Sequence, residues 1–169
     1  YELNNKSDVS GEVASNEFNN NNKIKFTNDV EDLKFVDVFV VCVPTPIDKD
    51  NKPYLKHLID VSELIGSVIK HRKIKTKPII IYESTVFPGA TEEVCIPCIE
   101  AISGCKLNTD FFCGYSPERI VPGNNEVKLT DIKKVTSGSN SKVSIWIDSF
   151  YKSFISAGTY RATSIKVAE

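Results

Sequence analysis

The chain has 169 residues, of which 41% are hydrophobic and 25% charged, and its 21 basic and 22 acidic side chains leave a formal net charge of −1. This length and apolar fraction suit one globular domain with its own core and exclude collagen-like and disordered classes. The near-zero charge, without a Lys/Arg stripe, argues against a nucleic-acid partner. The longest apolar run, residues 38–43, is far shorter than the ~20 residues needed to cross a bilayer, so we predict no membrane partner.

The cysteines are odd in number, which disfavours a disulfide framework and favours a reducing, cytoplasmic location. Cys95 and Cys98 form a C-x-x-C pair that would suit a redox site or half of a zinc site. Zinc needs two further ligands at short spacing, and the two histidines lie far apart in the sequence. We favour the alternative in which these cysteines are small buried hydrophobes on a helix face, and we predict no metal site.

The first part of the chain shows weak patterns followed by a strong one. Residues 1–22 are polar and rich in Asn and Ser, which predicts a loop or short helices. Residues 24–26 alternate and predict a short strand, and the acidic stretch 29–33 predicts a single helical turn. Residues 38–43 form a continuous, mostly β-branched run closed by a proline, which is typical of a strand buried on both faces of a parallel sheet.

A helix and a second strand follow. Residues 55–73 place apolar side chains at i, i+3, i+4 and i+7 and end in basic residues, which predicts an amphipathic helix. Residues 78–82 predict a second buried strand. A further helix is predicted to start near Pro88, because proline suits the first helical position and two glutamates would lie in the first turn.

The last part of the chain continues the alternation. Residues 111–115 and 133–136 predict two further strands, and residues 143–154 predict a third helix, capped by Ser139 or Ser141. Strands alternating with helices in this order predict an open α/β fold with parallel strands joined by right-handed crossovers.

Polar segments follow three of the predicted strands, and ligands of open α/β folds bind at such strand ends. Thr45 stands between two prolines in a rigid turn that could hold a ring or a ribose. Residues 83–91 offer polar groups and then a helix N-terminus that could bind an oxyanion or water. Glu118 and Arg119 offer a carboxylate for proton transfer beside a guanidinium for an anionic group. A plain turn, an ordinary helix cap and a solvated surface pair are the structural alternatives.

Taken together, these segments have a specific order and spacing. They resemble the nucleotide-sugar dehydrogenases, the UDP-glucose, UDP-N-acetylglucosamine and UDP-N-acetylmannosamine 6-dehydrogenases. The resemblance covers nearly the whole chain and is strongest to the bacterial branch that acts on UDP-N-acetylhexosamines for capsule and O-antigen synthesis. The matching segments are 43–46, 82–93, 114–123, 134–138, 157–160 and 164–169.

The resemblance implies an oxidoreductase that converts the C6 alcohol of a UDP-sugar to a carboxylate in two NAD-dependent steps. It implies that Thr85, through a water, and Glu118, by supporting proton transfer, are catalytic. The implied cofactor-binding residues are Val43, Pro44, Thr45, Ser84 and Thr85. The implied substrate-binding residues are Glu118, Arg119, Ile120, Val121, Pro122 and Gly123. Pro122 stands where glucose-specific members carry a second glutamate, which favours an N-acetylated sugar.

The resemblance also implies the domain organisation. Residues 23–160 would form the C-terminal portion of a Rossmann-type, doubly wound, mostly parallel NAD-binding domain, the second half only, preceded by the polar segment 1–22. Residues 161–169 would begin the helix that leads to a central domain.

The family's G-x-G-x-x-G turn is not found among the eight glycines, and the family's catalytic lysine, asparagine and cysteine would lie beyond residue 169. We therefore expect a fragment that is inactive alone, from a protein that is a homo-oligomer at full length. The alternative is a non-catalytic half-domain that binds nucleotide weakly or pairs with a partner fragment.

Overall fold

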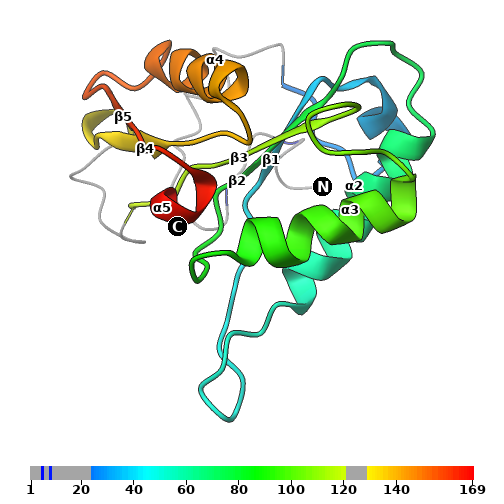
Figure 1. The fold of residues 1–169 in the computed structure, drawn as a ribbon, viewed down its shortest axis with the longest axis horizontal. Helices are drawn as coiled ribbons and strands as arrows, with labels where there is room; N and C mark the ends of the chain where they lie inside the picture. The colour runs from blue at the N-terminus through cyan, green and yellow to red at the C-terminus, as the bar shows by residue number, and fades with distance from the viewer. Residues whose placement is uncertain (1–4, 6–7, 9–23, 121–128) are drawn as a thin grey trace.

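The structure is a computed structural model, and it describes residues 5, 8, 24–120 and 129–169. Short strands alternate with helices, and the helices lie on both faces of a central sheet (Figure 1). The turn η2 is 3-10 helical, and η3 is a π-helical turn that runs directly into α3. The elements are η2 (Val30–Phe35), β1 (Val38–Val41), α2 (Lys56–Lys70), β2 (Ile79–Tyr82), η3 (Thr91–Cys95), α3 (Ile96–Ser103), β3 (Phe112–Tyr115), η4 (Leu129–Asp131), β4 (Lys134–Thr136), α4 (Ser141–Lys152), β5 (Thr159–Arg161) and α5 (Ile165–Ala168).

Within the described residues, the central sheet has three parallel strands in the order β1-β2-β3. The register pairs Val41 with Tyr82 and Tyr82 with Tyr115, so the three strands end at one level. A second, two-stranded parallel sheet contains β4 and β5. The predicted α/β fold with parallel strands is therefore confirmed. The sequence pattern does not predict β5, because its three residues are half-buried or exposed and form no apolar run.

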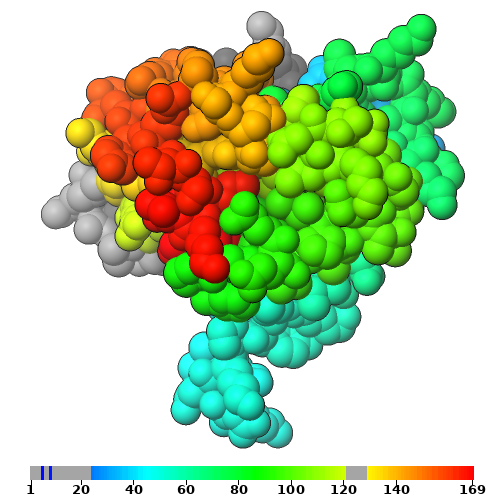
Figure 2. All heavy atoms as spheres, viewed as in Figure 1, coloured from blue at the N-terminus to red at the C-terminus, as the bar shows by residue number. Residues whose placement is uncertain are grey.

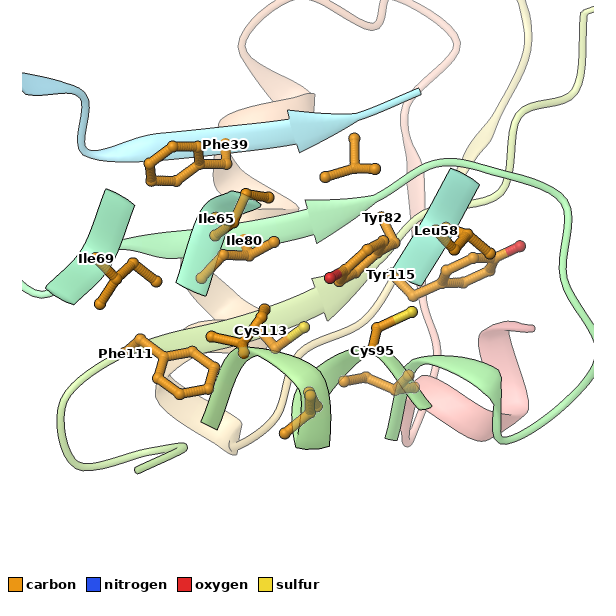
Figure 3. Packing of buried hydrophobic residues seen from close by; sticks show 14 of the residues in the cluster. Phe39, Leu58, Ile65, Ile69, Ile80, Tyr82, Cys95, Phe111, Cys113 and Tyr115 are labelled. Carbon is orange, nitrogen blue, oxygen red and sulfur yellow. The ribbon is translucent and has the colours of Figure 1, made fainter. Parts of the chain in front are cut away.

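Helices α2 and α3 cover one face of the central sheet. Phe39, Ile80 and Cys113 are neighbours across the three strands, and their side chains point into the layer between sheet and helices (Figure 3). The next row toward the strand ends contains Tyr82, whose hydroxyl is 2.6 Å from the Ser62 hydroxyl of α2. Side chains two apart in a strand share a face, which explains why alternate residues of each apolar run enter this core.

Helix α4 covers the opposite face, where Ile81 packs in a second cluster with Val143, Ile147 and Tyr151. This helix lies over β2 and β3 and leaves part of β1 uncovered. Val40 pairs with Ile81 in the register, yet its side chain is 44% exposed. The prediction that residues 38–43 are buried on both faces is therefore wrong on the α4 side, although both faces of β2 are buried as predicted.

Two predicted helix starts need correction. The helix predicted near Pro88 begins at Thr91, after a turn in which Gly89 has φ +102°. The N-cap of α4 is Asn140, not Ser139 or Ser141, because the Asn140 side chain accepts a hydrogen bond from the Val143 N–H at 3.0 Å. Its backbone is extended, with φ −153°, as an N-cap requires.

Two local predictions before β1 have opposite outcomes. Residues 24–26 form no strand, whereas the predicted helical turn is present as η2, capped by Asp29, whose side chain accepts from the Glu31 N–H. Cys95 is 1% exposed and packs in the core, as predicted for a buried hydrophobe, whereas Cys98 is only half-buried (Figure 3).

Candidate functional site

The aligned ends of β1, β2 and β3 bring three loops to one edge of the sheet. Val43 and Thr45 follow β1, Ser84 and Thr85 follow β2, and Glu118 follows β3. Each loop leaves the sheet within a few residues of the row that ends the three strands. The site residues expected from the sequence and present in the described structure therefore share one edge.

The loops after β1 and β2 are joined by two hydrogen bonds. The hydroxyl of Ser84, which is 5% exposed, donates to the Val43 carbonyl at 2.6 Å. The hydroxyl of half-buried Thr45 donates to the Thr85 carbonyl at 2.6 Å. Pro44 and the Thr85 side chain are exposed. This pairing fixes the two loops relative to each other and leaves the Thr85 side chain exposed.

The amide groups beyond Thr85 already have a partner. The carboxylate of Glu169 accepts from the Gly89 N–H at 2.5 Å and from the Thr91 N–H at 2.8 Å. Figure 2 shows the C-terminal segment against the loop that precedes η3. Capping therefore explains these amides, and the oxyanion interpretation of this helix start is not needed. Sequence reasoning missed Glu169, because 80 residues separate it from Gly89.

The loop after β3 is anchored at its base and exposed at its tip. The Ser116 hydroxyl donates to the Val135 carbonyl at 2.7 Å, and Pro117 is buried. Glu118 and Arg119 are exposed, and the Glu118 carboxylate accepts from the N–H of half-buried Ile120. The loop therefore presents a carboxylate and a guanidinium from a fixed base. The other predicted substrate residues, Val121, Pro122 and Gly123, lie outside the described residues.

Tyr115, the last residue of β3, has an environment that keeps it protonated. The pKa of Tyr115 is raised to about 12, chiefly by burial and also by the charge of Glu169, while Arg119 opposes the change. Its hydroxyl donates to the Ser84 carbonyl at 3.1 Å. Tyr115 therefore acts as a neutral link between the loop after β2 and the base of the loop after β3.

A buried ion pair lies beneath these loops, and the sequence analysis missed it. Lys134, on β4, donates to the Glu83 carboxylate at 3.1 Å and to the Pro117 carbonyl at 3.2 Å. The side chains of Lys134 and Glu83 are 2% and 14% exposed. The available signals were a glutamate directly after an apolar strand and a lysine inside another strand, both unusual for buried segments.

A cavity of about 290 Å³ adjoins the end of β1 and is lined by Val43, Pro44, His57, Asp60, Val61 and Leu64. Its lining mixes apolar side chains with an imidazole and a carboxylate, which suits a ring or a ribose. In the described part of the chain, no three His, Cys, Asp or Glu residues gather as metal ligands. No helix among the described residues is long and apolar enough to span a membrane.

Residues 10–155 match the family model described as the UDP-glucose/GDP-mannose dehydrogenase family, NAD binding domain. The chain belongs to this family. The resemblance inferred from the sequence motifs is thus confirmed, as is NAD as the cofactor of the matched domain. The UDP-N-acetyl-D-glucosamine 6-dehydrogenase of Pseudomonas aeruginosa is 50% identical over 158 residues, which cover 94% of this chain and 36% of that protein. The enzyme of the same name from Salmonella typhi is 46% identical over 168 residues, or 99% of this chain and 38% of that protein.

The crystal structure of a ternary complex of GDP-mannose dehydrogenase from Pseudomonas aeruginosa superposes with a TM-score of 0.84. The match covers 98% of this chain and 38% of that one, at 23% identity, and it confirms the Rossmann-type fold. The chain therefore spans 36–38% of the length of the curated dehydrogenases named above.

The residues at the β1 end fit one part of the family's cofactor. The cavity between β1 and α2 has the size and mixed polarity for one ring or ribose, and Val43 and Pro44 line it. The glycine-rich turn that seats a dinucleotide pyrophosphate does not occur in the sequence. Of the cofactor residues expected from the sequence, Val43 and Pro44 line this cavity, whereas Thr45 lies beside it in the same loop.

Proposed function

We propose that these residues supply the sugar-facing half of the NAD-binding domain in a UDP-N-acetylhexosamine 6-dehydrogenase. This enzyme would oxidise the C6 alcohol to a carboxylate in capsule or O-antigen synthesis. One observation supports this proposal most directly: β1, β2 and β3 end at the same level. The segments that contain Thr45, Thr85 and Glu118 therefore leave the sheet at one edge. Family membership then supports the assignment of the chemistry.

The choice of sugar rests on the relatives. Two proteins named UDP-N-acetyl-D-glucosamine 6-dehydrogenase are 50% and 46% identical over nearly the whole chain. A relative named GDP-mannose 6-dehydrogenase is 34% identical over 97 residues. The proline at position 122, in place of the second glutamate of glucose-specific members, supports the same choice. Capsule synthesis is supported by a protein named CapL from Staphylococcus aureus, 47% identical over 168 residues.

Thr85 and Glu118 have separate roles in the proposal. The exposed Thr85 hydroxyl would hold a water near the sugar C6, because its own backbone is fixed by the Thr45 hydroxyl. The Glu118 carboxylate would support proton transfer from the C6 oxygen, and Arg119 and Ile120 would shape the sugar pocket with residues 121–123. NAD, when bound at the Val43 end, supplies the hydride acceptor.

The test uses the purified full-length protein that carries these residues. NADH formation is measured with UDP-GlcNAc, UDP-ManNAc, UDP-glucose and GDP-mannose, and two NADH per UDP-N-acetylhexosamine are expected.

Glu118→Gln should lower kcat by about 10²–10⁴-fold, the range for a positioned proton-transfer group. Thr85→Val should lower kcat by about tenfold through loss of one hydrogen bond. The matched control is Glu63→Gln, an exposed carboxylate on α2. Turnover only with another nucleotide sugar would refute the substrate, and unchanged kcat in Glu118→Gln would refute the role of Glu118.

A second candidate, the non-catalytic half-domain, is favoured by one observation. Val40 on β1, Trp146 on α4 and Phe154, two residues after the end of α4, are 42–44% exposed, so these large apolar side chains lie at the surface. Such a surface would suit a partner fragment. This candidate expects no turnover from the full-length protein and an associated state of the 169-residue chain in sedimentation. A turnover-competent full-length protein would exclude it.

Two further expectations belong to the proposal. We expect the full-length enzyme to be a homo-oligomer, which sedimentation would test. We expect it in the cytoplasm, where all five cysteines of the chain would stay in the free state that the structure gives them.

A further inference from the structure

The Lys134 side chain contacts both loops that carry the proposed catalytic residues. Its ammonium donates to the carboxylate of Glu83, which lies two residues before Thr85. It also donates to the carbonyl of Pro117, the residue directly before Glu118. At 2% exposure it has no access to bulk water, so these contacts replace its hydration.

The other side of the ion pair is also occupied. Tyr151 of α4 donates its hydroxyl to the second oxygen of the Glu83 carboxylate, and its ring lies 5.5 Å from the Lys134 ammonium. Burial raises the pKa of Tyr151, and the carboxylate of Glu83 adds to this effect, so the phenol stays protonated and remains a donor. The ion pair therefore joins β4, the segment after β2 and helix α4.

The pair lies close to the three strand ends. Glu83 directly follows Tyr82, the last residue of β2, and Pro117 lies two residues after Tyr115, the last residue of β3. Loss of the pair would therefore act first on the two loops at this edge of the sheet.

We infer that Lys134 is a positioning residue, which fixes the loop of Glu118 relative to the loop of Thr85 by bridging the Glu83 carboxylate and the Pro117 carbonyl. The inference rests on the proposed function and deepens it. A buried ion pair adds little net stability compared with well-packed apolar side chains, but it fixes direction and distance. Because a misplacement of about 1 Å can cost about 10²-fold in rate, such a bridge controls kcat without contacting the substrate.

The principal variant replaces both charges, Glu83→Gln with Lys134→Met, because removing only one would leave an unpaired buried charge. In the full-length protein it should lower kcat by about 10–100-fold, with an unchanged Kd for NAD. The matched control is Lys133→Met, since Lys133 is the exposed neighbour of Lys134 and should leave kcat unchanged. The single variant Lys134→Arg keeps the positive charge and the hydrogen-bond donors, so its kcat should lie between that of the paired variant and that of wild type.

A double-mutant cycle separates positioning from general damage. If Lys134 acts through Glu118, the paired variant should lower kcat less than about threefold in a Glu118→Gln background. Two results would overturn the inference while leaving the proposed function intact. One is an equal loss of kcat in the wild-type and Glu118→Gln backgrounds, and the other is a paired variant whose kcat stays within about threefold of wild type. If the unmodified protein forms no NADH with any nucleotide sugar, the proposed function fails and the inference fails with it.

Discussion

Replacing Asp148 by Asn should destabilise the chain measurably. The Asp148 carboxylate accepts the Thr136 hydroxyl of β4 at 3.0 Å and the Thr159 hydroxyl of β5 at 2.5 Å. It also pairs with Lys152 at 2.7 Å, one turn further along α4. This carboxylate therefore joins α4 to both strands of the second sheet, and the amide removes its charge without changing its shape.

The magnitude follows from these contacts. Two charge-assisted hydrogen bonds become neutral, at a loss of about 1 kcal/mol each, and the i,i+4 ion pair adds about 0.3–0.5 kcal/mol. Relief of the desolvation of the buried charge offsets part of this sum, so Asp148→Asn should lower the free energy of unfolding by about 2 kcal/mol. Asp60→Asn is the control, because it removes only an exposed ion pair with Lys56 and should cost about 0.3–0.5 kcal/mol.

The pH dependence of this difference supplies a second measurement. Burial acts to raise the pKa of Asp148, but the hydrogen bonds from Lys152, Thr159 and Thr136 together hold it below 3.8. A depressed folded-state pKa contributes stability that is present above 3.8 and lost as the pH falls through the folded value. In urea unfolding, the difference between wild type and Asp148→Asn should therefore shrink below that pH. A difference under about 0.5 kcal/mol at neutral pH would refute the reasoning.

Three further outcomes are expected in urea unfolding. Gly114→Ala should cost about 1–3 kcal/mol or more, because the added Cβ would lie 2.5 Å from the backbone oxygen of Ser137; a neutral result would mean that β3 shifts freely. Burial raises the pKa of Cys95 from 9.0 to about 11, so the free energy of unfolding should fall as the pH rises between these values. Cys95→Ala should reduce that fall by about 2–3 kcal/mol. Unfolding free energies of wild type and variant that fall in parallel with pH would contradict this. Asn140→Ala should cost about 1 kcal/mol and Ser141→Ala much less, and the reverse order would place the helix cap at Ser141.

The sequence determined the elements whose signals are local. The apolar run 79–82 forms a strand buried on both faces, and the amphipathic period after residue 55 forms α2. Hydrophobic periodicity acts over neighbouring residues, so it can be read without knowing the fold. The motifs at the strand ends were also readable, because parallel strands bring their carboxyl ends to one edge and thereby place Thr45, Thr85 and Glu118 there.

Only the tertiary structure decided what depends on distant partners. Val40 and Ile81 have similar sequence surroundings, yet one is exposed and the other buried, because α4 covers β2 and leaves this part of β1 open. The pairing of Lys134 with Glu83 spans 51 residues, and no local pattern encodes a contact of that separation. Burial and partner choice for a polar side chain are set by which elements meet. The sequence therefore determined which loops follow the three strands, and the packing of β4 and α4 decided which buried charges lie beneath them.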